Sequence, residues 1–235
     1  MAMVLMNGAF GALAARVALQ AGHQLAATMR DPESRNRDAA AALREAGATV
    51  IEIDVTDDVS VAKGTEAAIA ALGGLDVLAN VAGIGTHGLS EGFTADQLLR
   101  LFDINVVGAH RMMRAALPSL RKQGAGLVIN VSSLLGRLSM PFYGPYSATK
   151  FALETLSDTY RVELSQLGVD VVLVEPGGFK TSRIGNLVHP PRTPGVSRTT
   201  ATLLRFQVKR YRDTRNFLTG NRNKIPPVSP QQSSP

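Results

Sequence analysis

MVLMNGAFGALAARVALQAGHQLAATM, residues 3–29, combines a strand, a short glycine turn, a helix and a second strand. Apolar residues dominate 3–6 and 24–29, which have the length of buried strands, and an alanine-rich helical pattern covers 11–21. A strand–helix–strand unit of this kind predicts a right-handed crossover between parallel strands. The fold is therefore expected to grow from this unit by repetition.

The rest of the chain repeats the same alternation. Further strands are predicted at 49–54, 76–79, 127–131 and 170–174, and further helices at 38–46, 57–72, 95–122 and 146–167. Continuous apolar runs such as LVINV and DVVLV indicate strands that helices cover on both faces. These patterns predict an α/β domain with a doubly wound parallel sheet, whose ligands bind beyond the carboxyl ends of the strands.

Composition narrows the functional classes. The chain has 235 residues, 45% of them hydrophobic, which suits one compact domain. It has no cysteine, so disulfides and cysteine-based metal sites are excluded, and we predict no metal site. No apolar stretch reaches the length of a membrane span. The apolar start lacks a leading positive charge and is interrupted by Arg16, so we interpret it as a strand of a cytoplasmic protein, not as a signal peptide.

Positive charge is concentrated in the last fifth of the chain. Residues 189–235 hold nine of the 25 basic residues and one of the 19 acidic ones, which leaves 16 basic and 18 acidic residues in 1–188. We therefore divide the chain into a domain, 1–188, and a basic, partly disordered extension, 189–235, in which we find no convincing seventh strand. Three interpretations stay open: an arm for nucleic acid or anionic membrane, a solvated extension, or the product of a shifted reading frame. The scarcity of aromatic residues disfavours nucleic acid.

The stretch SSLLGRLSMPFYGPYSATKFALETL, residues 132–156, carries the chemistry. Tyr146 and Lys150 are four residues apart at the start of a predicted helix, so they share a face. An ammonium near a phenol favours its phenolate form, which makes a group suited to proton transfer. Tyr143 is a competing phenol, but it has no lysine four residues later. Ser133 follows the strand 127–131 and is placed to donate a hydrogen bond to a carbonyl oxygen.

The order and spacing of these motifs resemble the short-chain dehydrogenase/reductase family from residue 3 to about 187. The matching residues are Asp54, Val55, Asn80, Val81, Ala82, Gly83, Asn105, Ser133, Tyr146, Ser147, Ala148, Thr149, Lys150, Pro176 and Gly177. The resemblance implies a Rossmann-type single domain. It also implies an NAD(P)-dependent oxidoreductase that interconverts an alcohol and a ketone or aldehyde by hydride transfer.

The resemblance assigns catalytic roles to four residues. Tyr146 would transfer the proton, Ser133 would orient the carbonyl, and Lys150 would hold the nicotinamide ribose. Asn105, in a helix that the family kinks, would hold a water that links Lys150 to solvent. The implied cofactor-binding residues are Gly8, Phe10, Gly11, Arg30, Asp54, Val55, Asn80, Ala82, Gly83, Tyr146, Lys150, Pro176, Gly177, Phe179 and Thr181. Among them, Asp54 and Val55 would meet the adenine, and Asn80, Ala82 and Gly83 would line its ribose.

The first turn departs from the family pattern. About three residues, one of them a glycine, are missing between Ala9 and Phe10, and Asn7 stands where the family has threonine. Fewer backbone N–H groups then surround a diphosphate at the helix start. The turn either contracts and binds the cofactor weakly or leaves the site blocked, and we favour weak binding. The alternative function is a catalytically impaired relative that acts as a binding or scaffold protein.

Cofactor and substrate preferences follow from single residues. Arg30 lies nearer than Asp31 to the end of the strand 24–29, which favours NADP over NAD, with NAD still possible. An apolar alcohol or carbonyl substrate is suggested by the residues expected near the site: Leu134, Leu138, Pro141, Phe142 and Phe179. The family further implies a homodimer or homotetramer formed through the two long helices.

Overall fold

The computed structural model describes residues 1–7, 11–177 and 187–191, without the side chains of residues 11 and 12. The chain divides into one unit, Met1–Pro190, and a second, Pro191–Pro235. Every described helix and strand belongs to the first unit. Residues 192–235 lie outside the described part, so the boundary predicted at 188 and the alternatives for the basic extension stay predictions.

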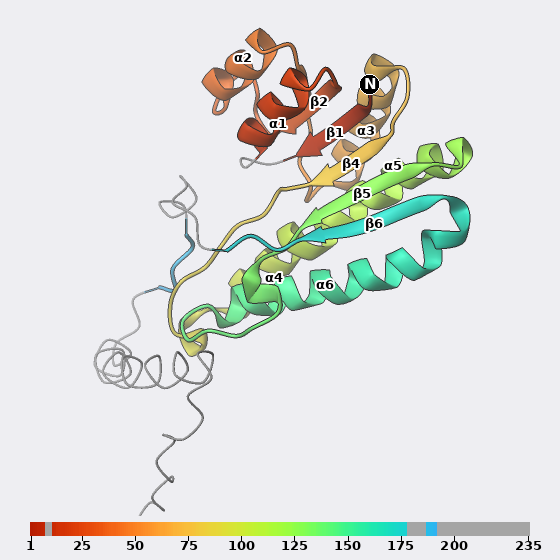
Figure 1. The fold of residues 1–235 in the computed structure, drawn as a ribbon. Coiled ribbons are helices and arrows are strands. Elements are labelled where there is room, and N and C mark those ends of the chain that lie inside the picture. The colour runs from red at the N-terminus through yellow and green to blue at the C-terminus, as the bar shows by residue number, and fades with distance from the viewer. Residues whose placement is uncertain (8–10, 178–186, 192–235) are drawn as a thin grey trace, which may run out of the picture. The chain divides into compact units, whose positions relative to one another are not determined.

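The first unit is built on a parallel sheet in the strand order β3-β2-β1-β4-β5-β6 (Figure 1). Its strands are β1 (Met3–Asn7), β2 (Gln24–Met29), β3 (Thr49–Glu52), β4 (Val77–Asn80), β5 (Gly126–Val131) and β6 (Val169–Val174). The order reverses between β1 and β4, which makes the carboxyl ends of these two strands the expected place for a ligand. The predicted doubly wound parallel sheet is confirmed.

Helices connect the strands. The helices are α1 (Gly11–Gln20), α2 (Arg37–Glu45), α3 (Asp58–Leu72), α4 (Ala95–Phe102), α5 (Gly108–Gln123) and α6 (Gly144–Leu164). Short turns of 3-10 helix are η1 (Ser90–Gly92), η3 (Leu134–Gly136) and η4 (Ser165–Leu167), and η2 (Asp103–Val107) is a π-helical segment. Local sequence signals explain where two of the helices begin. Thr94 and Gln97 form a capping box before α4, and Asp57 accepts a hydrogen bond from the Ser60 N–H at the start of α3.

Two apolar clusters fix the layers. One holds Leu5, Leu78 and Val128 of the sheet against α3, α5 and α6, and includes Met112 and Leu164. The other joins further strand residues to α1 and α2. Helices therefore pack on both faces of the sheet, as the continuous apolar strands predicted.

Two predicted elements are wrong in detail. The third strand ends at Glu52 and not at Asp54, because the Asp54 N–H donates its hydrogen bond to Ser60 Oγ (2.9 Å) instead of to a neighbouring strand. The helix predicted over 95–122 is not continuous, because the π-helical η2 separates α4 from α5. Segments of this kind are frequent at functional sites, and this one contains Asn105.

Candidate active site

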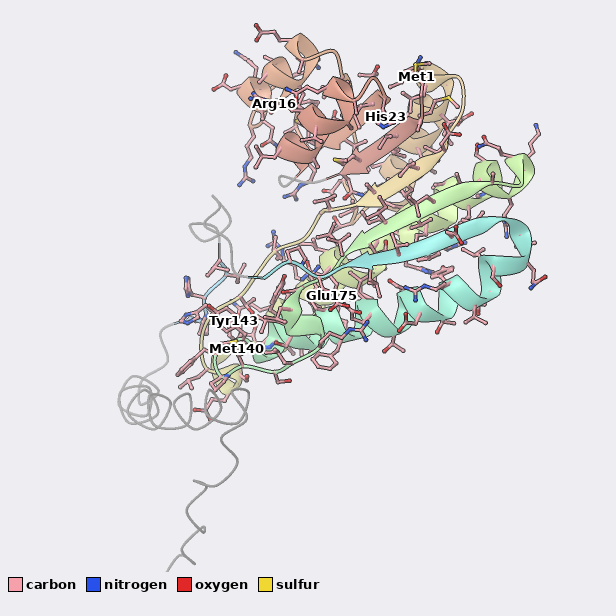
Figure 2. The ribbon with its side chains drawn as sticks, in the orientation of Figure 1. Met1, Arg16, His23, Met140, Tyr143 and Glu175 are labelled. Atoms are coloured by element: carbon pink, nitrogen blue, oxygen red, sulfur yellow. The ribbon has the colours of Figure 1, made fainter. Side chains whose placement is uncertain are left out.

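Tyr146 and Lys150 lie together on α6, as their spacing predicted. Both are buried, and Lys150 Nζ lies 5.8 Å from the centre of the Tyr146 ring. Lys150 Nζ also donates a hydrogen bond to the backbone oxygen of Val131, the last residue of β5 (2.8 Å). The start of α6 is thereby held at the carboxyl edge of the sheet. Figure 2 shows Tyr143, just before α6, at this edge, while Met1 and His23 lie at the opposite edge.

Ser133 follows β5 at the same edge. Its backbone is extended and its Oγ accepts a hydrogen bond from the Leu135 N–H (3.2 Å). Because a hydroxyl has one hydrogen to donate, that contact leaves the Ser133 O–H free to point toward a ligand oxygen. Ser132 differs: it is buried, and its Oγ has no hydrogen-bond partner among the residues that the structure describes. The predicted contact of Ser133 with a substrate oxygen stays a prediction.

Asn105 joins the loop after β4 to α6. Its Oδ1 accepts a hydrogen bond from the Ile84 N–H (2.8 Å), and its Nδ2 donates to the Ile84 carbonyl (2.9 Å) and to Thr149 Oγ1 (3.0 Å). Both amide hydrogens are used, and Oδ1 keeps one lone pair that could accept from a water. The predicted water-holding role of Asn105 stays a prediction.

A ladder of buried amides crosses the carboxyl edge. Asn7 Nδ2 donates to Asn80 Oδ1 (3.0 Å), Asn80 Nδ2 donates to Asn130 Oδ1 (2.9 Å), and Asn130 Nδ2 donates to Ser157 Oγ (2.9 Å). The side chain of Asn80 is therefore held between two strands. Its predicted contact with the cofactor ribose stays untested.

Asn7 also binds the start of the loop after β4, at the point where the strand order reverses between β1 and β4. Its Oδ1 accepts hydrogen bonds from the N–H groups of Val81 (2.8 Å) and Ala82 (2.6 Å), which begin the loop that contains Gly83. Sequence reasoning noted Asn7 only as a departure from the family pattern. The signal that could have found its role is a buried amide at the end of an apolar strand.

Arg30, which favours NADP, follows β2, and Asp54, which is predicted near the adenine, follows β3. Arg30 Nη1 is 3.7 Å from Asp54 Oδ2, and both side chains are partly exposed. Burial alone would raise the pKa of the Asp54 carboxyl, but two hydrogen bonds from Thr56 and the charge of Arg30 outweigh it and lower the pKa. Asp54 is therefore ionised at neutral pH and can accept hydrogen bonds.

Val55 is tied to the π-helical segment by a residue that sequence reasoning missed. Arg111 Nη1 donates to the Val55 carbonyl (3.1 Å) and pairs with Asp103 (2.7 Å), and its Nε pairs with Asp58 (2.9 Å). No spacing signal marks Arg111, because its partners come from three separate elements. The predicted adenine-binding segment and the segment with Asn105 thus share one anchor.

The remaining predicted cofactor residues are only partly described. Gly11 is the first residue of α1, Pro176 O accepts a hydrogen bond from the Leu134 N–H (3.0 Å), and Gly177 is exposed. Gly8, Phe10, Phe179 and Thr181 lie outside the described residues. Their predicted roles are untested.

Aromatic rings gather on the expected substrate side. The ring of His87 is tilted against that of Phe142 and edge-on to that of Tyr143, with ring centres 5.8 and 5.1 Å apart, and His189 Nδ1 lies 2.8 Å from the His87 carbonyl oxygen. Phe142 is buried, whereas Leu134, Leu138 and Pro141 reach the surface. The two histidines were not singled out from the sequence, because 102 residues separate them.

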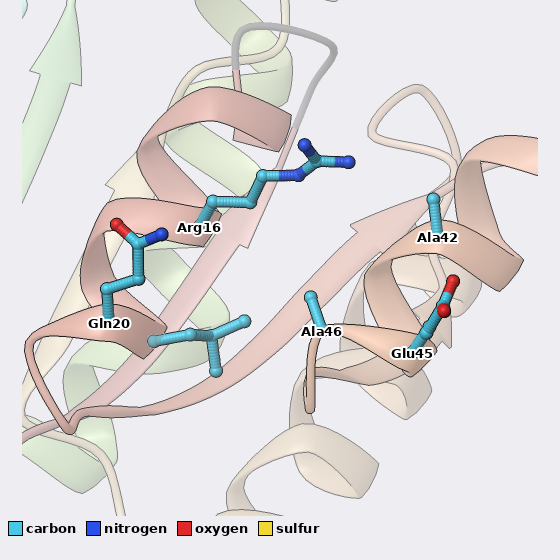
Figure 3. Close-up of a pocket in the computed structure, with 6 residues that line it drawn as sticks. Arg16, Gln20, Ala42, Glu45 and Ala46 are labelled. Carbon is cyan, nitrogen blue, oxygen red and sulfur yellow. The ribbon is translucent and has the colours of Figure 1, made fainter.

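A hollow of about 410 Å³ opens elsewhere, between α1 and α2 (Figure 3). Arg16, Leu19 and Gln20 of α1 line one side, and Ala42 and Glu45 of α2, with Ala46 just after that helix, line the other. None of these residues belongs to the strand ends or to α6, so the hollow is separate from the group around Tyr146. Among the described residues, no helix is long and apolar enough to cross a membrane, and no metal-binding group of His, Asp and Glu side chains occurs.

Comparisons with known proteins agree with this geometry. A family model described as short chain dehydrogenase matches residues 3–191. The chain is 33% identical to the 3-ketodihydrosphingosine reductase of Bacteroides thetaiotaomicron, over 78% of this chain and 66% of that protein. It is 34% identical to the retinol dehydrogenase 8 of Bos taurus, over 86% and 68%. A solved short-chain dehydrogenase/reductase from Burkholderia phymatum in complex with NAD is similar at a TM-score of 0.74 and 27% identity, over 87% and 78% of the two chains. The chain spans about two thirds of the length of these two curated relatives.

Proposed function

The chain belongs to the short-chain dehydrogenase family, and from this we propose that it interconverts an alcohol and a ketone or aldehyde with a nicotinamide cofactor. The single observation that supports this most is the placement of Tyr146 beside Lys150, with Lys150 held to the strand end that leads into Ser133. The bound nicotinamide would supply or accept the hydride.

The charged side chains at the carboxyl ends of the strands would suit a nicotinamide dinucleotide. Lys150 places a buried ammonium at the carboxyl edge of the sheet, next to the point where the strand order reverses. Arg30 and Asp54 leave a partly exposed cation and carboxylate at the far end of the same edge. Lys150 would hold the nicotinamide ribose, and Asp54 with Val55 would meet the adenine.

The chain's own groups would handle the proton and the orientation of the substrate. The Ser133 O–H would donate a hydrogen bond to the substrate oxygen and polarise the carbon–oxygen bond. The Tyr146 O–H would deliver a proton to that oxygen in reduction and take it back in oxidation. The Lys150 ammonium would favour the phenolate that remains, and Asn105 would hold α6 and a water in place.

For the cofactor we propose NADP, because Arg30 stands at the end of β2 where a 2′-phosphate would lie. NAD remains the second candidate, since the Burkholderia phymatum relative is a complex with NAD. For the substrate we propose an apolar carbonyl compound or alcohol. Exposed Leu134 and Leu138 support this, as do the lipid-like substrates in the names of the two relatives.

The experiment is an absorbance assay of NADPH and NADH oxidation with medium-chain, aromatic and steroid-like ketones and aldehydes. Turnover of apolar compounds supports the proposal, and turnover of small polar ones alone contradicts the substrate class. A lack of turnover together with a lack of cofactor binding would favour the catalytically impaired binding protein. The observation behind that second candidate is that β1 ends at Asn7 and α1 begins at Gly11, which leaves three residues for the first turn.

We also propose a homodimer or homotetramer that uses α4, α5 and α6. Apolar side chains on these helices are exposed in the single chain: Leu99, Phe151 and Val162. Light scattering after size-exclusion chromatography tests this proposal. The cytoplasmic location expected from the sequence stays a prediction, and fractionation of cells that produce the protein would test it.

A further inference from the structure

Glu154 is a buried carboxylate for which the proposed reaction has no use. It follows Tyr146 and Lys150 at four-residue intervals on α6, so the three share one face of the helix. Only 3% of Glu154 is exposed, and neither carboxylate oxygen accepts a hydrogen bond from the described residues. Arg137 Nη2 lies 3.0 Å from Glu154 Oε2, an ion pair whose angles are not those of a hydrogen bond. Since an unpaired buried carboxylate is costly, the guanidinium is needed there.

Arg137 reaches a second carboxylate on another element. Its Nε donates to Glu175 Oε1 (2.9 Å), the residue directly after β6. The hydrogen bond to Glu175, and next the charge of Glu154, raise the pKa of the guanidinium, so it stays charged. One side chain therefore joins α6 to the end of β6.

Arg137 itself ends the turn that carries Ser133. It directly follows the η3 turn as its C-cap, and its N–H donates a hydrogen bond to the Leu134 carbonyl (3.1 Å). The Leu134 N–H in turn bonds to Pro176 O (3.0 Å), and the Ser132 N–H bonds to Val174 O (2.8 Å). The turn is thus anchored to the segment after β6 by its backbone at one end and by Arg137 at the other.

Gly136 lets this turn lie directly on Glu154. A Cβ added at Gly136 would lie 2.7 Å from Ser132 Oγ and 2.9 Å from Glu154 Oε1, which is closer than real contacts allow. A larger residue at 136 would force the side chains of Ser132 and Glu154 to shift. Because the turn packs directly against Glu154 at Gly136, a displacement of the Glu154 side chain would also displace the turn.

We infer that Arg137 is a positioning residue for Ser133: by joining Glu154 to Glu175 it fixes the turn 133–137 and with it the hydroxyl that meets the substrate oxygen. This inference rests on the proposed function for its consequence in catalysis. The geometry of the anchor itself does not depend on that function.

The first test is independent of activity. Hydrogen–deuterium exchange is measured on Arg137→Met and on a control, Arg161→Met, whose side chain is equally exposed and links Asp158 to the Val171 carbonyl. We expect exchange in a peptide covering 132–138 to become about fivefold faster in Arg137→Met, because local opening costs less free energy without the anchor. The control should leave that peptide at the wild-type rate. Equal rates in Arg137→Met and wild type would overturn the inference.

The second test asks whether Arg137 acts through Ser133. Arg137→Met should lower kcat about tenfold to a hundredfold, because a displaced orienting group is costly even over small distances. Cofactor affinity, read from NADPH fluorescence, should stay unchanged. In a Ser133→Ala background the same substitution should change kcat less than about twofold, since coupled residues are not additive. Arg137→Lys should recover part of the loss.

The outcomes separate the inference from the proposed function. An equal loss of kcat with and without Ser133 assigns Arg137 a general structural role and overturns the inference. If the wild-type protein reduces no carbonyl compound, the proposed function fails while the exchange measurement still decides on the anchor. Should Arg137→Met not fold, Glu175→Gln removes one arm and should give the same changes in smaller size; unchanged exchange there would also overturn it.

Discussion

Lys150 is bound to Val131: its ammonium donates a hydrogen bond across 2.8 Å to the last carbonyl of β5. That bond fixes the start of α6 against the strand end that continues into Ser133. The ring of Tyr146, one helical turn earlier, lies 5.8 Å from the same ammonium. A phenol, a cation and a hydroxyl are therefore brought to one edge of the sheet by two consecutive elements.

Replacing Tyr146 with Phe should reduce carbonyl reduction by about a hundredfold or more, because general acid catalysis contributes about that factor. The ring remains to fill its buried place, so folding should be preserved. The measurement is kcat from NADPH absorbance, with thermal unfolding as a check. Tyr143→Phe is the matched control, and activity that persists in Tyr146→Phe but falls in the control would assign the proton to the other phenol.

Asn7→Ala should destabilise the protein by about 1–3 kcal/mol, since it leaves Asn80 Oδ1 and the N–H groups of Val81 and Ala82 without a buried partner. Urea unfolding followed by circular dichroism measures this. Gln123→Ala removes an exposed amide bonded to Asp76 and should change stability far less. Equal losses in the free energy of unfolding would mean that the buried amide ladder stabilises the protein no more than an exposed hydrogen bond does.

Stability should fall as the pH drops below about 6.5, and His110 is the cause. Burial, and next the charges of Arg114 and Arg111, lower the pKa of His110 from its ordinary 6.5. The unfolded chain therefore binds the proton first, so the contribution is present above 6.5 and is lost toward the lower folded pKa. Protonation also leaves Nδ1 able only to donate in its 2.7 Å hydrogen bond with the Tyr160 hydroxyl oxygen, whereas the neutral ring can donate or accept there according to its tautomer.

The measurement is the urea midpoint at several pH values between 7.5 and 5.5. His110→Gln should flatten this dependence, and Arg121→Gln, an exposed change on the same helix, should leave it as in the wild type. A wild-type slope retained in His110→Gln would assign the titration to another group.

The elements and the proximity of Tyr146 and Lys150 were predictable because their signals are local. Apolar strand runs and helical spacing fix β1 to β6, and the four-residue interval places Lys150 beside Tyr146. Helical spacing did not reveal the π-helical segment η2, although the family resemblance implied a kink at Asn105. This segment depends on Asn105 reaching the backbone of Ile84, 21 residues earlier in the chain.

Long-range partners explain what else was missed. Arg137 bonds to Glu175, 38 residues later, and His189 meets His87 across 102 residues. Such contacts depend on how the carboxyl ends of the strands line up, and no periodicity records them. Anchoring residues around a site are therefore harder to predict than the site's own motif.

Arg30→Ala should weaken the binding of NADPH more than that of NADH. We expect the KM for NADPH to rise by about tenfold or more relative to the KM for NADH, because a hydrogen bond to a charged group contributes about 1.5–3 kcal/mol. The ratio of the two KM values in the absorbance assay measures this. Arg44→Ala, an exposed arginine paired with Glu33, is the control. A ratio unchanged by Arg30→Ala would rule out the 2′-phosphate as its partner and favour NAD.

Lengthening the first turn should tighten cofactor binding. Three residues, one of them a glycine, are inserted between Ala9 and Phe10, which adds N–H donors at the start of α1 where an anion binds. We expect the Kd for NADPH to fall by about tenfold or more, since each bond to a charged group is strong. The same insertion in the exposed turn after Glu33 is the control. If the wild type already binds tightly and the insertion changes nothing, the three-residue turn is sufficient. The catalytically impaired alternative then loses its supporting observation.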